Sequence, residues 1–109
     1  SIGDFSWIGD DVGLYSLGEI EIGNHVVISQ KSYLCTGSHD FEKMEFPIYH
    51  KKIQIEDECW LATDVYVAPG VTIGKGTIVG ARSSVFKNLP SNAICMGAPA
   101  KIIRERIRE

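Results

Sequence analysis

The sequence predicts an all-β fold, a solenoid of about four stacked coils with one protruding loop and a short C-terminal helix. The first observation is an aliphatic residue at every sixth position, best seen in the run Ile55, Leu61, Val67, Ile73, Val79 and Val85. The second is a glycine directly after several of these positions, as at Gly74 and Gly80. The third is that the spacing matches neither the 3.6-residue period of a helix nor the alternation of a half-buried strand. A period of six, rich in Val, Ile and Gly, is typical of a short strand and a tight turn in repetition.

Three six-residue units make one triangular coil, and the units predict coils over residues 2–19, 22–39, 55–72 and 73–90. The aliphatic residues point into the coil, where stacked coils bury them in continuous ladders and pair their strands in parallel. The residue four places later is mostly small or β-branched, as at Cys59, Thr77 and Ser83, and it fits a tight corner. The first coil begins at residue 2, so we expect a further segment or another chain to cover that end.

Two stretches break the period. Residues 40–54 are aromatic and charged and predict a loop that leaves the solenoid, and long loops in compact proteins are often functional. The repeat is expected to end at Pro90, so that residues 1–90 form the β-helix domain and residues 91–109 a tail. Within that tail, Pro99 suits a first helical turn, and Ile103 and Ile107 share a helix face. Arg106 and Arg108 are then expected on the surface of this helix.

Composition and charge limit the classes of function that are open to this chain. The chain of 109 residues favours one domain, and its net charge of −3 argues against nucleic acid as a partner. Residues 1–64 hold 12 of the 14 acidic residues, whereas residues 65–109 hold 7 of the 11 Lys and Arg residues. The basic C-terminal part could therefore bind a small anion. No apolar run reaches the roughly 18 residues of a membrane span. The three cysteines have no C-x-x-C spacing, which favours reduced thiols in the cytoplasm.

Several segments together resemble the hexapeptide-repeat acyltransferases. They are I-G-N-H-V-V-I-S (22–29), T-G-S-H-D (36–40), D-E-C-W-L-A-T-D-V-Y-V-A-P-G-V-T-I-G (57–74), V-G-A-R-S-S-V (79–85) and G-A-P-A-K-I-I-R-E (97–105). Within that family the sequence is similar to the colanic acid biosynthesis acetyltransferases and their galactoside, maltose and nodulation relatives. The resemblance implies a left-handed parallel β-helix, although parallel crossovers are normally right-handed. It also implies a homotrimer with active sites between subunits, and acetyl-coenzyme A as co-substrate.

His39 is the candidate general base, because a neutral imidazole can take a proton from an acceptor hydroxyl near pH 7. The resemblance assigns that role to the His of the T-G-S-H-D segment. Asp40 is the candidate partner that fixes its tautomer. A backbone carbonyl, or Glu19 or Glu21 from the preceding coil, could orient His39 instead. Transfer would be direct, because no Ser or Cys has a visible base partner.

The resemblance also supplies candidate residues for the coenzyme and the acceptor. Those for the pantetheine arm are Trp60, Thr63, Gly80, Ala81 and Ser83. Those for the phosphates are Lys87, Lys101 and Arg104, which can make charge-assisted contacts. Those for the acceptor are Tyr15, Ser16, Phe46 and Tyr49. The loop aromatics Phe41, Phe46 and Tyr49 could alternatively hold the loop against a neighbouring subunit.

The sequence therefore predicts an O-acetyltransferase acting on a hydroxyl of a sugar or polysaccharide precursor. Two alternatives stay open: an acetyltransferase for a nucleotide-sugar amine or an antibiotic hydroxyl, and an inactive trimeric scaffold. The γ-class carbonic anhydrases share the repeat, but His25, His39 and His50 lack the close pair of zinc ligands seen in those enzymes. No metal is expected.

Overall fold

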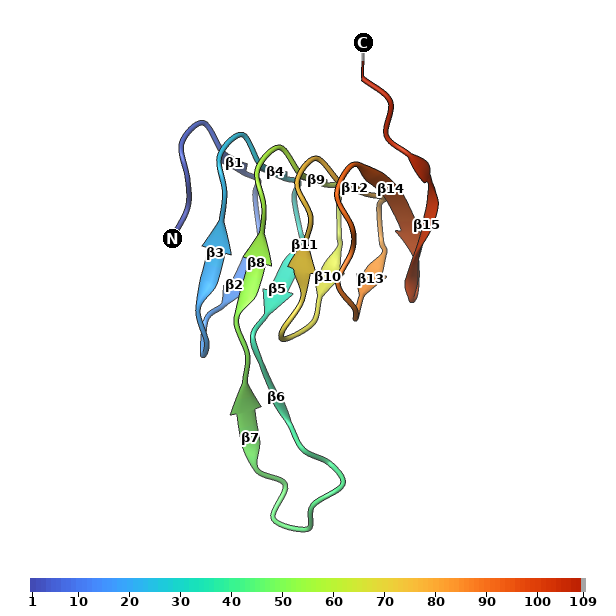
Figure 1. The fold of residues 1–109 in the computed structure, drawn as a ribbon. Helices are drawn as coiled ribbons and strands as arrows, with labels where there is room; N and C mark the ends of the chain where they lie inside the picture. Colours follow the sequence, from blue (N-terminus) through green and yellow to red (C-terminus); the bar gives the residue numbers. More distant parts are fainter. Residues whose placement is uncertain (109) are drawn as a thin grey trace.

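The computed structural model describes residues 1–108 and consists of short strands arranged in three faces around one core (Figure 1). The first face holds β1 (Trp7–Ile8), β4 (Val27–Ile28), β9 (Trp60–Leu61), β12 (Ile78–Val79), β14 (Ala93–Gly97) and β15 (Ala100–Glu105). The second holds β2 (Gly13–Tyr15), β5 (Tyr33–Cys35), β10 (Tyr66–Val67) and β13 (Ser84–Val85). The third holds β3 (Ile20–Ile22), β8 (Ile53–Ile55) and β11 (Thr72–Ile73). A separate pair, β6 (Gly37–His39) and β7 (Ile48–His50), lies outside these faces.

The chain visits the three faces in turn and forms a left-handed parallel β-helix. In Figure 1 the coils advance from the N-terminus to the right. The chain rises along β3 and β8 on the near side and crosses over the top to β4 and β9. This sense of winding is left-handed, as the resemblance implied. The coils together with the protruding loop have extents of 52 × 28 × 20 Å.

Parallel pairing in strict register stacks the aliphatic residues into three ladders. Ile8 pairs with Ile28, Ile28 with Leu61, and Leu61 with Val79. The other ladders are Leu14–Leu34–Val67–Val85 and Ile22–Ile55–Ile73. Ile28, Leu34, Leu61, Val67, Ile73 and Val79 have no exposed surface. The six-residue spacing therefore identified the core correctly, because each unit returns its aliphatic residue to the same place in the next coil.

Tight turns join the faces, and those before and after the first face each place one residue in the left-handed backbone region. At the corner before the first face these residues are Phe5, His25, Glu58, Gly76 and Asn92. The N–H of Glu58 donates to the carbonyl of Asn24 at 2.9 Å, and that of Gly76 to the carbonyl of Asp57 at 2.9 Å. These bonds between stacked turns offset the cost of left-handed backbone at residues other than glycine.

The predicted C-terminal helix is wrong. Residues 100–105 form β15, which runs antiparallel to β14 after a turn with a cis peptide bond at Ala98–Pro99. An unpaired edge of β14 would leave its N–H and C=O groups open, and β15 satisfies them. The parallel sheet also continues past the predicted boundary at residue 90, because β14 pairs with β12. Residues 1–108 contain no helix, hence none long and apolar enough to cross a membrane.

Candidate active site

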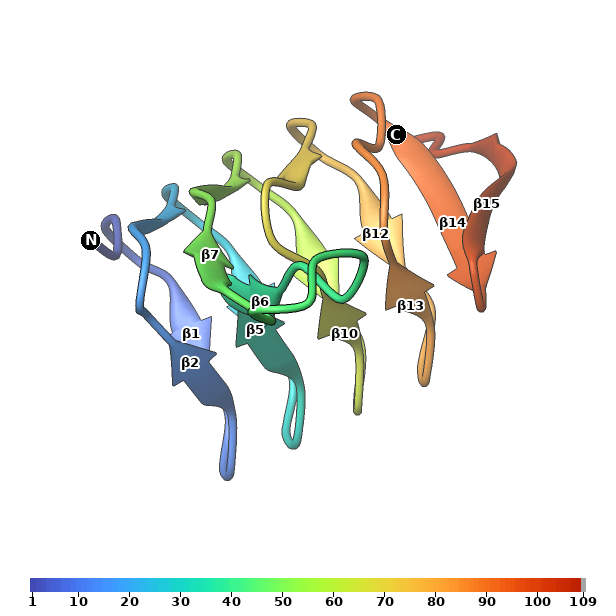
Figure 2. The same cartoon turned by 90° about the horizontal axis from the view of Figure 1, so that it is seen from below.

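A β-hairpin projects from the solenoid between β5 and β8, where the loop was predicted. Its strands β6 and β7 pair antiparallel, with His39 opposite Ile48 and Ser38 opposite Tyr49. In Figure 1 the hairpin extends well away from the coils, at the corner between the second and third faces, and in the view from below in Figure 2 it lies in front of them. At its tip, Phe41 and Met44 are largely or fully exposed. The hairpin therefore presents its side chains to whatever approaches this corner.

The His39 imidazole is held by the far side of the hairpin loop. Its Nδ1 lies 3.0 Å from the main-chain carbonyl oxygen of Phe46. A carbonyl can only accept, so Nδ1 carries the proton, and the lone pair of the neutral ring stays on Nε2. The Phe46 ring stacks on the imidazole, with centroids 4.2 Å apart and planes 13° from parallel. His39 thus has the tautomer and the fixed ring plane that a general base needs.

Phe46 adopts a backbone conformation that is rare for a bulky residue. Its φ angle is 52°, in the left-handed region, which costs about 1–2 kcal/mol for a residue with a Cβ. Its N–H donates to the carbonyl of Lys43 at 3.0 Å and closes the turn. The outcome of this turn is that the Phe46 carbonyl points back toward His39.

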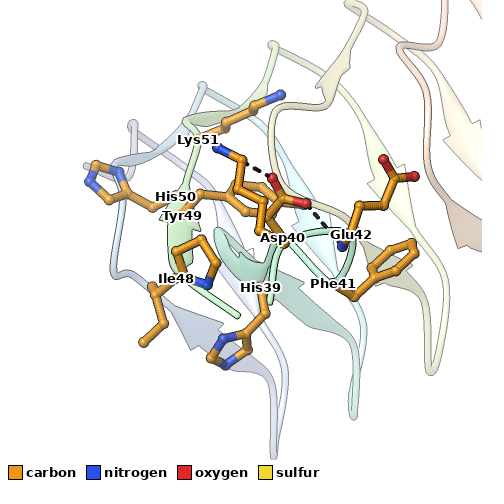
Figure 3. A pocket seen from close by; sticks show the side chains of 10 residues that line it. His39, Asp40, Phe41, Glu42, Ile48, Tyr49, His50 and Lys51 are labelled. Carbon is orange, nitrogen blue, oxygen red and sulfur yellow. Dashed lines mark hydrogen bonds and ion pairs between the residues drawn. The ribbon is translucent and has the colours of Figure 1, made fainter. Parts of the chain in front are cut away.

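Asp40 lies beside His39 in sequence but points elsewhere, as Figure 3 shows. Its carboxylate accepts a hydrogen bond from the N–H of Glu42 at 3.2 Å and lies 3.9 Å from Nζ of Lys43. The contact to Nδ1 of His39 comes from neither Glu19 nor Glu21. Both carboxylates pair with Lys52 instead, and the hydrogen bond from Lys52 lowers the pKa of Glu21. The orienting group is a backbone carbonyl, one of the alternatives that the sequence left open.

An open pocket of about 560 Å³ lies against the hairpin, whose side chains line it (Figure 3). Its lining residues are His39, Asp40, Phe41, Glu42, Lys43, Pro47, Ile48, Tyr49, His50 and Lys51. Tyr49, a candidate acceptor residue, therefore shares this pocket with His39, and Nζ of Lys51 lies 5.7 Å from its ring centre. Tyr15 is the last residue of β2 and Ser16 follows it, and the Tyr15 ring packs close to Gly37 at the base of the hairpin.

Most of the candidate coenzyme residues lie along the first face and the corner that follows it. Trp60 is on β9, where its Nε1 donates to Oγ of Ser29 at 3.0 Å. Thr63, Gly80 and Ala81 come after β9 and β12, and Lys101 and Arg104 are on β15. Two candidates differ. Ser83 is buried and its Oγ accepts from the N–H of Gly97 at 3.0 Å, whereas Lys87 follows β13 at the hairpin's corner.

The structure thus separates the two groups of candidates within one chain. Figure 1 shows β9, which carries Trp60, at the top of the solenoid, and the hairpin with His39 at the bottom. The body of the coils lies between them. A single chain cannot bring His39 and Trp60 to one small substrate without a large rearrangement.

The comparisons with known proteins agree with this architecture. The family model "Bacterial transferase hexapeptide (six repeats)" matches residues 52–87. The chain is 66% identical over 107 residues to the colanic acid biosynthesis acetyltransferase WcaF of Escherichia coli (strain K12). The chain carries the hexapeptide repeat of the bacterial transferases. The match covers 98% of this chain and 59% of WcaF, so the chain spans about three fifths of the length of that relative.

Solved structures of hexapeptide-repeat acetyltransferases share the fold over nearly the whole chain. A maltose O-acetyltransferase from Clostridium difficile 630 has a TM-score of 0.93 at 26% identity, covering 98% of this chain and 59% of its own. A hexapeptide-repeat acetyltransferase from Vibrio cholerae O1 biovar eltor, solved in complex with acetyl-coenzyme A, has a TM-score of 0.90 at 32% identity. That match covers 98% of this chain and 60% of the other. The predicted family resemblance and fold class are confirmed.

Two features of the chain escaped sequence reasoning. The role of the Phe46 carbonyl has no sequence signal, because every residue has a carbonyl. Arg106 and Arg108 were expected on a helix surface, and that is wrong. Nη1 of Arg106 donates to the carbonyls of Glu58 and Gly76 at 3.1 and 2.9 Å, and Arg108 pairs with Glu58 at 3.0 Å.

Among residues 1–108, no group of three or more His, Cys, Asp and Glu is arranged to hold a metal.

Proposed function

We propose that this protein transfers the acetyl group of acetyl-coenzyme A to a hydroxyl of a sugar or polysaccharide precursor. The observation that carries the proposal is His39, whose Nδ1 donates to the Phe46 carbonyl, in a chain 66% identical to WcaF. The similarity to WcaF supports a polysaccharide acceptor, and the Vibrio cholerae complex supports the donor. The free thiols of Cys35, Cys59 and Cys95 favour a reducing compartment, the cytoplasm.

In the proposed reaction, Nε2 of His39 takes the proton of the acceptor hydroxyl as its oxygen attacks the thioester carbonyl. The C–O bond forms, and the negative charge collects on the carbonyl oxygen. The tetrahedral intermediate then collapses, the C–S bond breaks, and the imidazolium returns the proton to the coenzyme A thiolate. His39 is half-buried, so acceptor atoms can reach it. Asp40 supports the loop in this scheme, because its carboxylate bonds to Glu42.

The same proposal places each active site between two copies of the chain. His39 and Trp60 lie on opposite sides of one solenoid, so a site that uses both takes them from different subunits. A cyclic trimer repeats this head-to-tail contact three times and closes. Tyr15, Ser16, Phe46 and Tyr49 would then face the acceptor side. Trp60, Thr63, Gly80, Ala81, Lys101 and Arg104 would face the coenzyme, with Ser83 supporting the turn from inside and Lys87 at the neighbouring corner.

The decisive experiment combines binding with turnover. Acetyl-coenzyme A is titrated calorimetrically into the protein, and acetyl transfer to a panel of sugars and amino sugars is followed by thiol release. His39→Ala should bind the donor normally but lower kcat by about 10²–10⁴-fold, the usual contribution of a general base. His25→Asn is the control, because His25 is exposed on the solenoid and Asn tolerates its left-handed backbone. Turnover that survives His39→Ala would exclude His39 as the base.

Mixed assemblies test the shared site. His39→Ala and Trp60→Ala chains are each assayed alone and then unfolded and refolded together. If one site combines residues of two subunits, random mixing should restore about one quarter of the wild-type sites. Activity that stays at the mean of the two variants would contradict the shared site. Mass measurement in solution on the same sample gives the number of subunits.

A further inference from the structure

Two separate contacts from one residue hold the His39 ring. The Phe46 carbonyl oxygen lies 3.0 Å from Nδ1, and the Phe46 ring lies parallel to the imidazole at 4.2 Å. The first contact decides which nitrogen carries the proton, and the second limits rotation of the ring about its χ angles. Both depend on the left-handed backbone of Phe46, which turns its carbonyl and its side chain to the same neighbour.

We propose that Phe46 is a positioning residue that holds His39 in the Nδ1–H tautomer with its plane fixed. The sequence offered Phe46 as an acceptor-binding residue or as a contact to a neighbouring subunit, whereas its contacts in the structure are with His39. The assignment of His39 as that base rests on the proposed function. The tautomer itself does not, because it can be measured without substrate.

The chemistry explains why such a residue matters. The tautomer of a neutral imidazole is set by the hydrogen bond that its other nitrogen makes. If Nδ1 loses its acceptor, part of the population carries the proton on Nε2, and that nitrogen can then no longer accept a proton from the substrate. A strained backbone at a bulky residue persists only where its surroundings hold it, and such residues are common at functional sites. Here the turn closed by the Lys43 carbonyl holds it.

A matched pair of variants separates the carbonyl from the ring. Phe46→Gly and Phe46→Val both remove the aromatic ring. Glycine adopts a positive φ without steric cost, whereas a β-branched residue strongly disfavours it. Phe46→Tyr keeps the ring and the backbone, so we expect it to keep the wild-type tautomer. Met44→Ala, at a fully exposed position of the same turn, is the control for a change in the loop.

The tautomer is measured by ¹⁵N NMR of the full chain labelled at histidine, with the His39 signals assigned by their loss in His39→Ala. We expect Nδ1–H in the wild type, in Phe46→Tyr and mostly in Phe46→Gly, and a shift toward Nε2–H in Phe46→Val. Where acetyl transfer is measurable, kcat should fall about tenfold or more in Phe46→Val with KM little changed, short of the 10²–10⁴-fold loss of the base itself. Melting curves check that each variant keeps the solenoid.

Each result bears on a different claim. An Nε2–H tautomer in the wild type, or equal shifts in Phe46→Gly and Phe46→Val, would overturn the role of the Phe46 carbonyl. Equal kcat in Phe46→Gly and Phe46→Tyr would overturn the role of the ring. If His39→Ala keeps full turnover while the wild-type tautomer is Nδ1–H, the proposed base fails and the positioning contact stands.

Discussion

The stacked coils and the projecting hairpin are built on opposite principles. In the coils, aliphatic side chains are buried in ladders and each backbone turn bonds to the next. In the hairpin, Phe41, Met44, Phe46 and Ile48 are all more than half exposed. The hairpin is nevertheless the part that holds His39. Stability thus resides in the repeat, and the candidate chemistry resides where the repeat is interrupted.

This division has a physical reason. A residue inside the solenoid must match the residue above and below it, which leaves little freedom to shape a site. A segment that leaves the coils is free of that constraint and can arrange a loop around one imidazole. Its cost is that the loop keeps few buried contacts. Substitutions in the coils should therefore lower the free energy of unfolding more than substitutions in the hairpin do.

The largest expected effect is on the free energy of unfolding of the core. Leu61 has no exposed surface, so Leu61→Ala should lower that free energy by about 2–5 kcal/mol. Ile48→Ala in the hairpin, at a side chain 62% exposed, should change it by less than about 0.5 kcal/mol. Urea unfolding of both variants measures the difference. Similar losses in the two variants would show that the hairpin is part of the cooperative core.

A smaller difference is expected between two glycines. A Cβ on Gly74 would lie 2.5 Å from the backbone nitrogen of Ser91 and 2.6 Å from the carbonyl carbon of Pro90. Gly74→Ala must therefore push the next coil away and should cost about 1–3 kcal/mol. At Gly37 in the hairpin base, the nearest atoms to an added Cβ belong to the Tyr15 and Leu17 side chains, at 2.9 and 3.0 Å, and not to the backbone. Gly37→Ala should cost less in thermal unfolding, and the reverse order would contradict tight backbone stacking at Gly74.

The smallest effect concerns Glu58, which is partly exposed on a corner of the solenoid. Hydrogen bonds from Arg108 and Lys75 lower the pKa of this carboxyl group. A lowered folded-state pKa contributes stability above the unfolded pKa, and that contribution is lost as pH falls through the folded value. Glu58→Gln should therefore be slightly less stable than the wild type at pH 7, and the difference should shrink as the pH falls below the usual pKa of a glutamate, about 4.3. Glu45→Gln in the hairpin is the control, and a stability difference that persists in acid would exclude the ion pairs as its cause.

The sequence predicted the solenoid well because its information is local and repeated. Ile28, Leu61 and Val79 fall at six-residue steps, and each lies in the ladder that this spacing predicts. The same reasoning failed for residues 99–109. The spacing of Ile103 and Ile107 fits a helix, but the free edge of β14 favours a strand at residues 100–105. A spacing over four residues carries no information about an edge that forms ten residues earlier in the chain.

For the candidate site, the sequence by itself determined which side chains are available and where the repeat is broken. The interruption at residues 40–54 follows from the period alone, whereas the choice of His39 as the candidate base also needed the family resemblance. Only the tertiary structure decided what orients His39, because the acceptor of its Nδ1 proton is the Phe46 carbonyl. Its direction depends on one left-handed φ angle, and backbone carbonyls are the same in every residue. The winding of the coils likewise decides that Trp60 and His39 lie on opposite sides of the solenoid. Each coil brings residues that are distant in sequence to one face and places successive segments on different faces.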